Sequence, residues 1–254
     1  MQKIRILQPI GWCEGVKQAI NNLNKIIKKH KNNIYLIGQL IHNKETMNYY
    51  IKKDIKILDG VDRLKLIKSI KNKDATIVFS AHGTSQNIID YANQHFKHVY
   101  DLTCKYVKAN YLLVNKLKSQ GHSVTYYGNK NHPESIAMKS LGISFKPSKT
   151  SILINQTTIP LIKVKKIQQK YKCKWIPTTC LATKKIHQNI LKLPIHSQLL
   201  VIGDKNSNNT KELIGLAKQH QLKVNCKFDE SKVLYITSGT SVSKKQVHEA
   251  IKSL

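Results

Sequence analysis

Short β-branched runs alternate with amphipathic runs along the whole chain, and this alternation limits the fold more than any other feature. Between residues 15 and 30 the apolar side chains recur at helical spacing from Val16 to Ile27. Further helices are predicted over 106–121, 159–171, 209–221 and 241–254. Strands are predicted over 3–7, 34–38, 75–80, 98–102, 123–128, 151–155, 173–177, 198–203, 222–226 and 232–237. Repeated β–α alternation indicates an α/β fold with parallel sheets covered by helices.

Three cysteines, Cys13, Cys104 and Cys180, divide the chain into thirds of similar length, which suggests three similar α/β lobes. Each follows a strand-like run and precedes a helix-like run, where the positive end of a helix dipole favours the thiolate. Three thiolates brought to one point would suit a four-iron cluster with one open iron, because a closed cluster uses four ligands. On spacing alone, three buried thiols that only pack are the simpler interpretation. The polar motifs of the chain favour the cluster.

Cys173 and Cys226 are predicted inside strands, as packing or surface thiols. Five cysteines, an odd number, do not form a disulfide framework, so we expect a reducing compartment.

Six polar clusters lie between a predicted strand and the run that follows it: 42–43, 81–86, 131–135, 155–158, 205–210 and 238–241. Ligands of parallel α/β sheets bind beyond the carboxyl ends of the strands, and helix N-termini attract anions there. Any one cluster is explained by helix capping. Six together exceed what capping requires, and they predict a site for a phosphate-bearing ligand.

Histidines occupy three of these clusters, at His42, His82 and His132. They lack the close pair that is typical of zinc sites, so phosphate binding is favoured over zinc. Glu134 follows His132 at a predicted helix start, where its carboxyl group could deliver protons to a substrate. The alternative is a first-turn acid that is stabilised only by the helix dipole.

The formal net charge of +29 would suit nucleic-acid binding. However, the lysines are spread over the chain and Arg5 and Arg63 are its only arginines, whereas proteins that read bases rely on arginine. We therefore expect no specific nucleic-acid partner. The first residues lack the apolar core of a signal peptide, and no apolar run reaches the length of a membrane span, so we expect a cytoplasmic protein without a membrane partner.

The ordered motifs GWCEGV, LIHN, FSAHGTSQ, DLTC, HPE, NQTT, TCLAT, KNSNNT and SGTS resemble the LytB family of 4-hydroxy-3-methylbut-2-enyl diphosphate reductases. The resemblance covers nearly the whole chain, from Cys13 to Ser241. It implies three small α/β lobes with parallel sheets, in a pseudo-threefold cloverleaf around a central iron–sulfur cluster. The lobes are expected over 13–101, 102–178 and 179–254, after an N-terminal strand segment at 1–12.

The same resemblance implies roles by position. Cys13, Cys104 and Cys180 would be the three ligands of one 4Fe–4S cluster with an open iron. Glu134 would supply protons, and Thr157 would bind the substrate hydroxyl. The diphosphate would be held by His42, His82, His132, Ser207, Asn208, Asn209 and Ser241.

The implied reaction removes the hydroxyl group of a small allylic diphosphate reductively and yields isopentenyl and dimethylallyl diphosphate, the last step of the non-mevalonate pathway. Ferredoxin or flavodoxin would deliver the electrons.

The chain departs from the family pattern in several places. Lys184, Lys185 and Ile186 replace an Asn-Arg-Gln stretch, and Asn208 stands where a second serine is usual, although an amide still donates to phosphate. The alternative to the reductase is a non-catalytic protein of the same fold that binds a metal or a polyanion. A structural zinc protein is a third interpretation.

Overall fold

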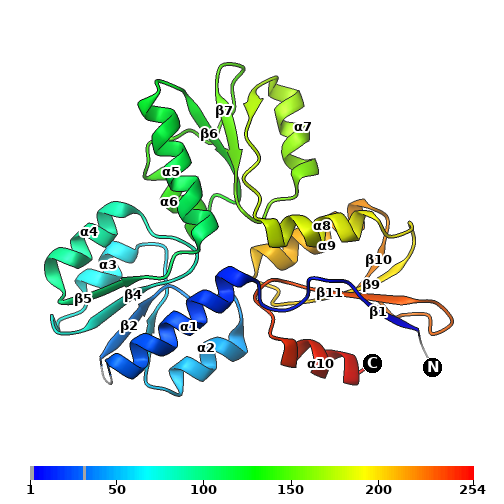
Figure 1. Ribbon diagram of the computed structural model, residues 1–254, viewed down its shortest axis with the longest axis horizontal. Coiled ribbons are helices and arrows are strands. Elements are labelled where there is room, and N and C mark those ends of the chain that lie inside the picture. The colour runs from blue at the N-terminus through cyan, green and yellow to red at the C-terminus, as the bar shows by residue number, and fades with distance from the viewer. Residues whose placement is uncertain (1–2, 31–32) are drawn as a thin grey trace. The chain divides into compact units, whose positions relative to one another are not determined.

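The computed structural model describes residues 3–30 and 33–254 (Figure 1), so the first two residues of the expected segment 1–12 lie outside it. The strands of these residues form three sheets, in which every pairing is parallel. The chain divides into two compact units. The first unit comprises Met1–Glu14, Thr157–Lys165 and Thr179–Leu254, and the second comprises Gly15–Gln156 and Lys166–Thr178. The predicted α/β class with three parallel-sheet lobes is confirmed.

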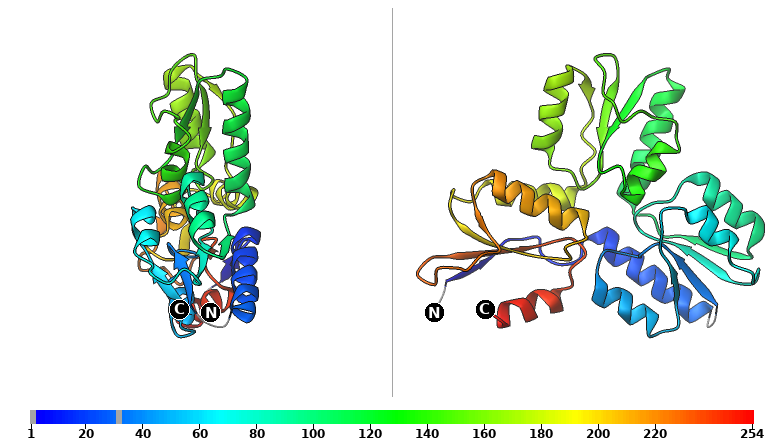
Figure 2. Two further views of the ribbon diagram at one scale, coloured as in Figure 1. Left: turned by 90° about the vertical axis from the view of Figure 1, so that its left-hand side faces the viewer. Right: turned by 180° about the vertical axis from the view of Figure 1, so that it is seen from behind.

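The first unit contains one sheet in the order β1-β11-β9-β10. Its strands are β1 (Ile4–Ile6), β9 (Gln198–Ile202), β10 (Lys223–Val224) and β11 (Leu234–Ser238). Helices α8 (Leu181–Leu191) and α9 (Asn208–Gln219) lie on one face of this sheet, and α10 (Lys244–Lys252) lies on the other (Figures 1 and 2). The core between the sheet and the first two helices is apolar and closed to solvent, as at Ile190, Leu199 and Leu213.

The second unit contains two sheets, in the orders β3-β2-β4-β5 and β6-β7-β8. The first of these consists of β2 (Ile34–Ile37), β3 (Lys56–Leu58), β4 (Thr76–Phe79) and β5 (His98–Asp101). The second consists of β6 (Val124–Tyr127), β7 (Ile152–Asn155) and β8 (Lys174–Trp175). The helices are α1 (Glu14–Lys29), α2 (Lys44–Ile51), α3 (Arg63–Lys68), α4 (Gln86–His95), α5 (Lys105–Ser119), α6 (Pro133–Lys139) and α7 (Leu161–Tyr171). The division between the units falls inside α1 and α7.

The strand pattern follows from burial on both faces of each sheet. All four residues of β4 are buried, as are all four of β7, and such continuous apolar runs are typical of covered parallel strands. Nine of the ten predicted strands contain an observed one, and the tenth, 232–237, overlaps β11, which ends one residue later at Ser238. The structure also contains β3 and α3, of three and six residues, which were not predicted. The predicted strand positions of Cys173 and Cys226 are wrong, because Cys173 precedes β8 and Cys226 follows β10.

The three sheets repeat one arrangement around their cysteines. Cys13, Cys104 and Cys180 follow β1, β5 and β8, each of which is an edge strand, and each cysteine directly precedes the helix or stands at its N-cap. The neighbouring strand of each sheet, β11, β4 or β7, ends in one of the polar clusters. The next strand, β9, β2 or β6, ends in another. The three sheets therefore match in topology, although their sequences do not reveal a repeat.

Within residues 3–30 and 33–254, every helix is too short or too polar to cross a bilayer.

A buried arginine fixes the polar loop after β4. Arg63 at the start of α3 is 7% exposed, and its Nη1 donates to the carbonyl oxygen of Gly83 at 2.7 Å and to Thr84 Oγ1. Its Nη2 donates to Ser80 Oγ at 3.2 Å. Gly38 makes room for this side chain, because a Cβ there would stand 2.6 Å from Nη2. The guanidinium fork thus joins the carboxyl end of β4 to the loop that carries His82.

We expect Arg63→Met to lower the free energy of unfolding by about 2–4 kcal/mol, since it leaves three buried acceptors without their donor. Denaturant unfolding of the apoprotein measures the change. Lys65→Met, at an exposed position on the same helix, should stay within about 0.5 kcal/mol of the parent. Equal stabilities of the two variants would contradict this assignment.

Candidate active site

Three histidines from two different sheets meet in the second unit. His42 follows β2, His82 follows β4, and His132 follows β6. The rings of His42 and His82 are stacked with centroids 4.3 Å apart, and the ring of His132 lies 5.8 Å and 5.4 Å from them. One nitrogen from each ring lies within 4.8 Å of the others. Histidines that are separated by dozens of residues in the sequence therefore present their nitrogens to a single point.

The surroundings keep the rings of His82 and His132 neutral. Burial lowers the pKa of His132 to about 3, and His42 and the Arg63 charge add smaller effects in the same direction. The pKa of His82 is also well below its usual value, first through desolvation and then through His42 and His132. The backbone N–H of Glu134 donates to His132 Nδ1 at 3.2 Å, so the proton of the neutral ring resides on Nε2. His132 is thereby set as a neutral hydrogen-bond donor.

Glu134 lies at the start of α6, directly after His132 and Pro133, and is only 1% exposed. Tyr126 Oη donates to its Oε1 at 3.0 Å. A carboxyl group that is buried next to histidines has the environment of a functional acid rather than that of an exposed helix-start residue. The second unit therefore brings together four of the predicted site residues.

A cavity of about 340 Å³ opens beside this cluster. His42, Arg63, Gly83 and Asn131 contribute to its lining, together with apolar side chains of α4 and α6. The cavity gives a small ligand access to His42 within the second unit.

The first unit brings together the predicted hydroxyl and amide groups. Ser207 caps α9, Asn208 and Asn209 form its first turn, and Ser241 follows the adjacent strand β11. All four side chains are buried. Asn209 Nδ2 donates to Thr240 Oγ1 at 2.7 Å, which ties the two polar clusters together, while its Oδ1 has no hydrogen-bond partner among the described residues. The N-terminus of α9 adds backbone donors that suit an anion.

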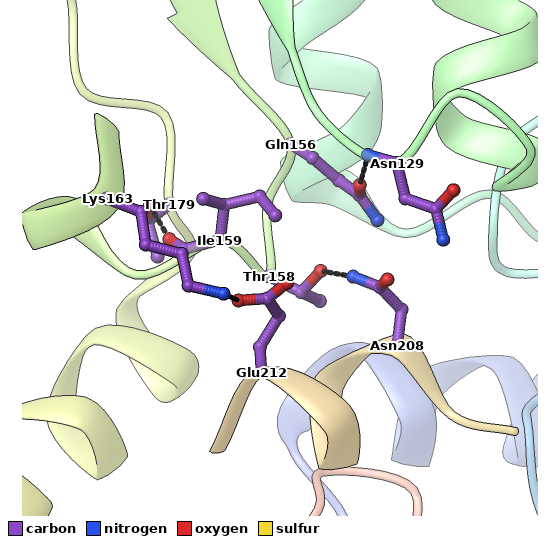
Figure 3. A network of polar contacts seen from close by, with 8 residues as sticks. All are labelled: Asn129, Gln156, Thr158, Ile159, Lys163, Thr179, Asn208 and Glu212. Atoms are coloured by element: carbon purple, nitrogen blue, oxygen red, sulfur yellow. Dashed lines mark hydrogen bonds and ion pairs between the residues drawn. The ribbon is translucent and has the colours of Figure 1, made fainter. Parts of the chain in front are cut away.

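Asn208, one of the positions that depart from the family pattern, bridges to the segment after β7. Its Nδ2 donates to Thr158 Oγ1 at 2.9 Å (Figure 3). The ion pair between Lys163 and Glu212, at 2.6 Å, holds the same segment to α9 (Figure 3). Thr157, the predicted ligand of the substrate hydroxyl, directly precedes Thr158 in the sequence and is also buried. The asparagine side chain is longer than the serine that is usual at this position, and it gives α9 a contact with the segment after β7.

The three candidate cluster ligands have equivalent backbone settings. The N–H groups of Cys13, Cys104 and Cys180 donate to the carbonyl oxygens of Thr240, Ala81 and Thr157, at 3.1, 3.0 and 3.0 Å. Each acceptor lies in or just after the polar cluster of the strand beside the cysteine's own strand. All three thiols are partly exposed and free of disulfides. Two of these cysteines belong to the first unit and Cys104 to the second.

The chemistry of this donor set fits an iron–sulfur cluster. Cys104 and Cys180 stand at N-caps without making a side-chain cap hydrogen bond, so their sulfur atoms lie at positive helix ends that favour thiolate. Cys180 Sγ also lies 3.1 Å from Thr183 Oγ1, a hydroxyl group that can donate to a thiolate. In contrast, Cys173 is buried and Cys226 is exposed, and neither begins a helix.

Three residues beside this site were not singled out from the sequence. Arg63 contacts the loop that carries His82, and Tyr126 contacts Glu134. Tyr111 of α5 packs its hydroxyl group closely against Gly83, since a Cβ at that glycine would lie 2.1 Å from the hydroxyl oxygen. None of the three belongs to a polar motif. Their contacts arise from the fold, and a single sequence carries no signal for them.

A family model described as LytB protein matches residues 4–254 of the chain. The 4-hydroxy-3-methylbut-2-enyl diphosphate reductase of Malacoplasma penetrans is 34% identical over 94% of this chain and 92% of its own length. The reductase of the same name from Symbiobacterium thermophilum is 30% identical over 86% of this chain and 81% of its own length.

Solved structures share the fold. The E-1-hydroxy-2-methyl-but-2-enyl-4-diphosphate reductase of Plasmodium falciparum superimposes with a TM-score of 0.82 at 20% identity, over 100% of this chain and 88% of that one. A second structure, described as the terminal enzyme of the non-mevalonate pathway, gives a TM-score of 0.66 at 23% identity. Because the family model spans nearly all of the sequence and both relatives reach 30% identity, the chain belongs to the LytB family that its motifs predicted.

Proposed function

We propose that this chain is a 4-hydroxy-3-methylbut-2-enyl diphosphate reductase that acts as its relatives are named. It removes the hydroxyl group of the allylic diphosphate and releases isopentenyl and dimethylallyl diphosphate, the last step of the non-mevalonate pathway. The observation that carries the proposal is the buried carboxyl group of Glu134 beside the cluster of three histidines, because it joins a proton source to a set of anion-binding donors. A cytoplasmic location, as predicted, suits an oxygen-sensitive cofactor.

Membership of the LytB family implies an iron–sulfur cofactor. The proposed form is one 4Fe–4S cluster ligated by Cys13, Cys104 and Cys180, with one iron open. When bound, such a cluster supplies electrons one at a time and a Lewis-acidic iron. The proposed electron donor is an acidic protein such as ferredoxin or flavodoxin, which the net charge of +29 would attract.

The diphosphate is proposed to bind to neutral donors. They are His42, His82, His132, Ser207, Asn208, Asn209 and Ser241. Neutral hydrogen bonds to a charged acceptor are strong where water is excluded, and most of these side chains are buried. Thr157 is proposed to orient the substrate hydroxyl group.

The proposed proton steps balance with two electrons. One proton from Glu134 joins the departing hydroxyl oxygen, which leaves as water, and a second proton adds to the allylic carbon skeleton. Two electrons replace the pair of the broken C–O bond. His132 holds Glu134 in place through its contact with the backbone N–H of that residue, at 3.2 Å.

The three histidines also favour a second candidate, a zinc-binding protein without reductase activity, because their nitrogens lie within 4.8 Å of one another. Metal analysis after anaerobic purification separates the two. About four irons per chain and a broad visible absorbance support the reductase. Stoichiometric zinc without iron after reconstitution would support the alternative.

We expect serine at Cys13, Cys104 or Cys180 to remove most of the bound iron, because a hydroxyl group is a far weaker ligand than a thiolate. Iron content and the visible spectrum measure the loss. Cys173→Ser and Cys226→Ser are the matched controls and should keep their iron. Iron loss from a control, together with its retention in Cys104→Ser, would refute the ligand assignment.

The neutral histidines make stability depend on pH. As the pH falls below 6.5, the unfolded chain protonates at position 132, whereas folded His132 does not until the pH nears 3, so the fold loses stability across this window. At pH 5 this costs about 2 kcal/mol relative to pH 7. His132→Asn retains an N-cap and should lose about 2 kcal/mol less over that range. Denaturant unfolding of apoprotein at both values tests this, with His122→Asn at an exposed position as control. Identical losses in all three proteins would count against it.

We expect Glu134→Gln to reduce turnover at least ~10²-fold, the lower end of general-acid contributions, while iron content and substrate binding persist. Glutamine retains the size and the acceptor oxygen but cannot give up a proton usefully. Steady-state assays with an artificial reductant measure turnover. Glu45→Gln is the matched control, since Glu45 also lies in the first turn of a helix but is exposed. Near-parental turnover in Glu134→Gln would rule out the proton-donor role.

A further inference from the structure

The carboxyl group of Glu134 has one tyrosine as a direct partner that belongs to none of the motifs. Tyr126 Oη donates to Glu134 Oε1 at 3.0 Å, and both side chains are closed to solvent, at 0% and 1% exposure. Tyr126 lies in β6, and Glu134 follows in the first turn of α6 (Figure 1). The strand and the helix are thus linked through the acid itself.

The ring of Tyr126 is a member of the apolar core. It packs in the cluster that contains Val114, Met138 and Ile154, and it forms an edge-type pair with the ring of Phe145, with centroids 5.4 Å apart. A phenylalanine would fill this space equally well. Because a buried tyrosine hydroxyl needs a partner, the value of tyrosine at this position lies in its oxygen.

We propose that Tyr126 is a positioning residue for the reaction: its hydroxyl group holds Oε1 of Glu134 as an acceptor, so that Oε2 carries the transferable proton. The proposal rests on the proposed function, since it assumes that Glu134 is the proton donor. Tyr126 touches neither substrate nor cofactor in this role. It acts on the orientation and acidity of the carboxyl group.

The direction of the effect follows from the hydrogen bond. A donor to a carboxyl oxygen stabilises the ionised form, so Tyr126 makes Glu134 a better acid than burial alone would allow. Tyr126 keeps its own proton, because burial and the neighbouring Glu134 raise its pKa well above 10. After transfer of the proton from Oε2, the carboxylate remains hydrogen-bonded at Oε1, and no charge is left without a partner.

The other ionisable groups near Glu134 come from three elements. Tyr111 faces it from α5, and its hydroxyl group has no hydrogen-bond partner among the described residues. His132 precedes it at the N-cap, and Arg63 of α3 lies near Tyr111 and His132. Burial raises the pKa of Tyr111 and lowers that of His132, so neither changes charge near neutral pH. Tyr111 and His132 therefore do not account for a pH response near neutrality, and the part that belongs to Glu134 is the part that Glu134→Gln removes.

The test is Tyr126→Phe in the holoenzyme. We expect kcat to fall about tenfold with KM within about twofold, which corresponds to one charge-assisted hydrogen bond that acts on the chemical step. The high-pH limb of the kcat profile, where the donor loses its proton, should move upward by about one pH unit. Iron content should not change.

Tyr127→Phe is the matched control, because successive residues of a strand point to opposite faces. In this variant the high-pH limb should lie at the same pH as in the parent, and kcat should stay within about twofold of the parent value. An unmoved limb in Tyr126→Phe, or an equal movement in both variants, would overturn the proposal.

A second measurement does not require activity. Infrared titration of the apoprotein follows the carbonyl band of the protonated carboxyl group, which Glu134→Gln identifies by its loss. The midpoint should rise by about one unit in Tyr126→Phe. If this midpoint rises but the holoenzyme has no reductase activity, the proposed function fails while the hydrogen-bond role stands. If the midpoint is unchanged, the positioning role fails whatever the activity.

Discussion

One backbone hydrogen bond, made three times, organises the chain. The N–H groups of Cys13, Cys104 and Cys180 each donate to a carbonyl oxygen at the end of the adjacent parallel strand. Such a bond requires the edge strand to stop where its neighbour's polar loop begins, and the next helix to start at the cysteine. The same bond therefore sets the thiol, the helix dipole and the polar loop together in each sheet.

This constraint explains why so much was predictable from one sequence. Buried parallel strands must be short apolar runs, and the polar clusters must follow them, so the ten predicted strands and the six clusters stand out. His42, His82 and His132 belong to three of these clusters, and their convergence follows from two sheets that share one unit. β3 and α3 were not predicted, and neither belongs to the alternation of strands and polar clusters.

Contacts that depend on packing could not be predicted from the sequence. The sequence showed Arg63 only as one of two arginines, yet its side chain is buried against the loop of His82. Tyr126 looked like an ordinary strand residue with an apolar ring, and only the approach of α6 shows that its hydroxyl group meets Glu134. Such pairings join residues 8 to 20 positions apart through loops whose geometry no local pattern encodes.

The total charge of the chain is a poor guide to the character of its site. Among the described residues, Arg63 and Glu134 are the only arginine, lysine, aspartate or glutamate side chains that are buried, and both lie by the histidines. Desolvation keeps His82 and His132 neutral, so a protein with a net charge of +29 presents mainly uncharged donors there. A site of this kind binds an anion through directed hydrogen bonds. Salt weakens such buried hydrogen bonds less than it weakens the attraction between an anion and exposed lysine charges. Burial, rather than composition, therefore decides what the site can bind.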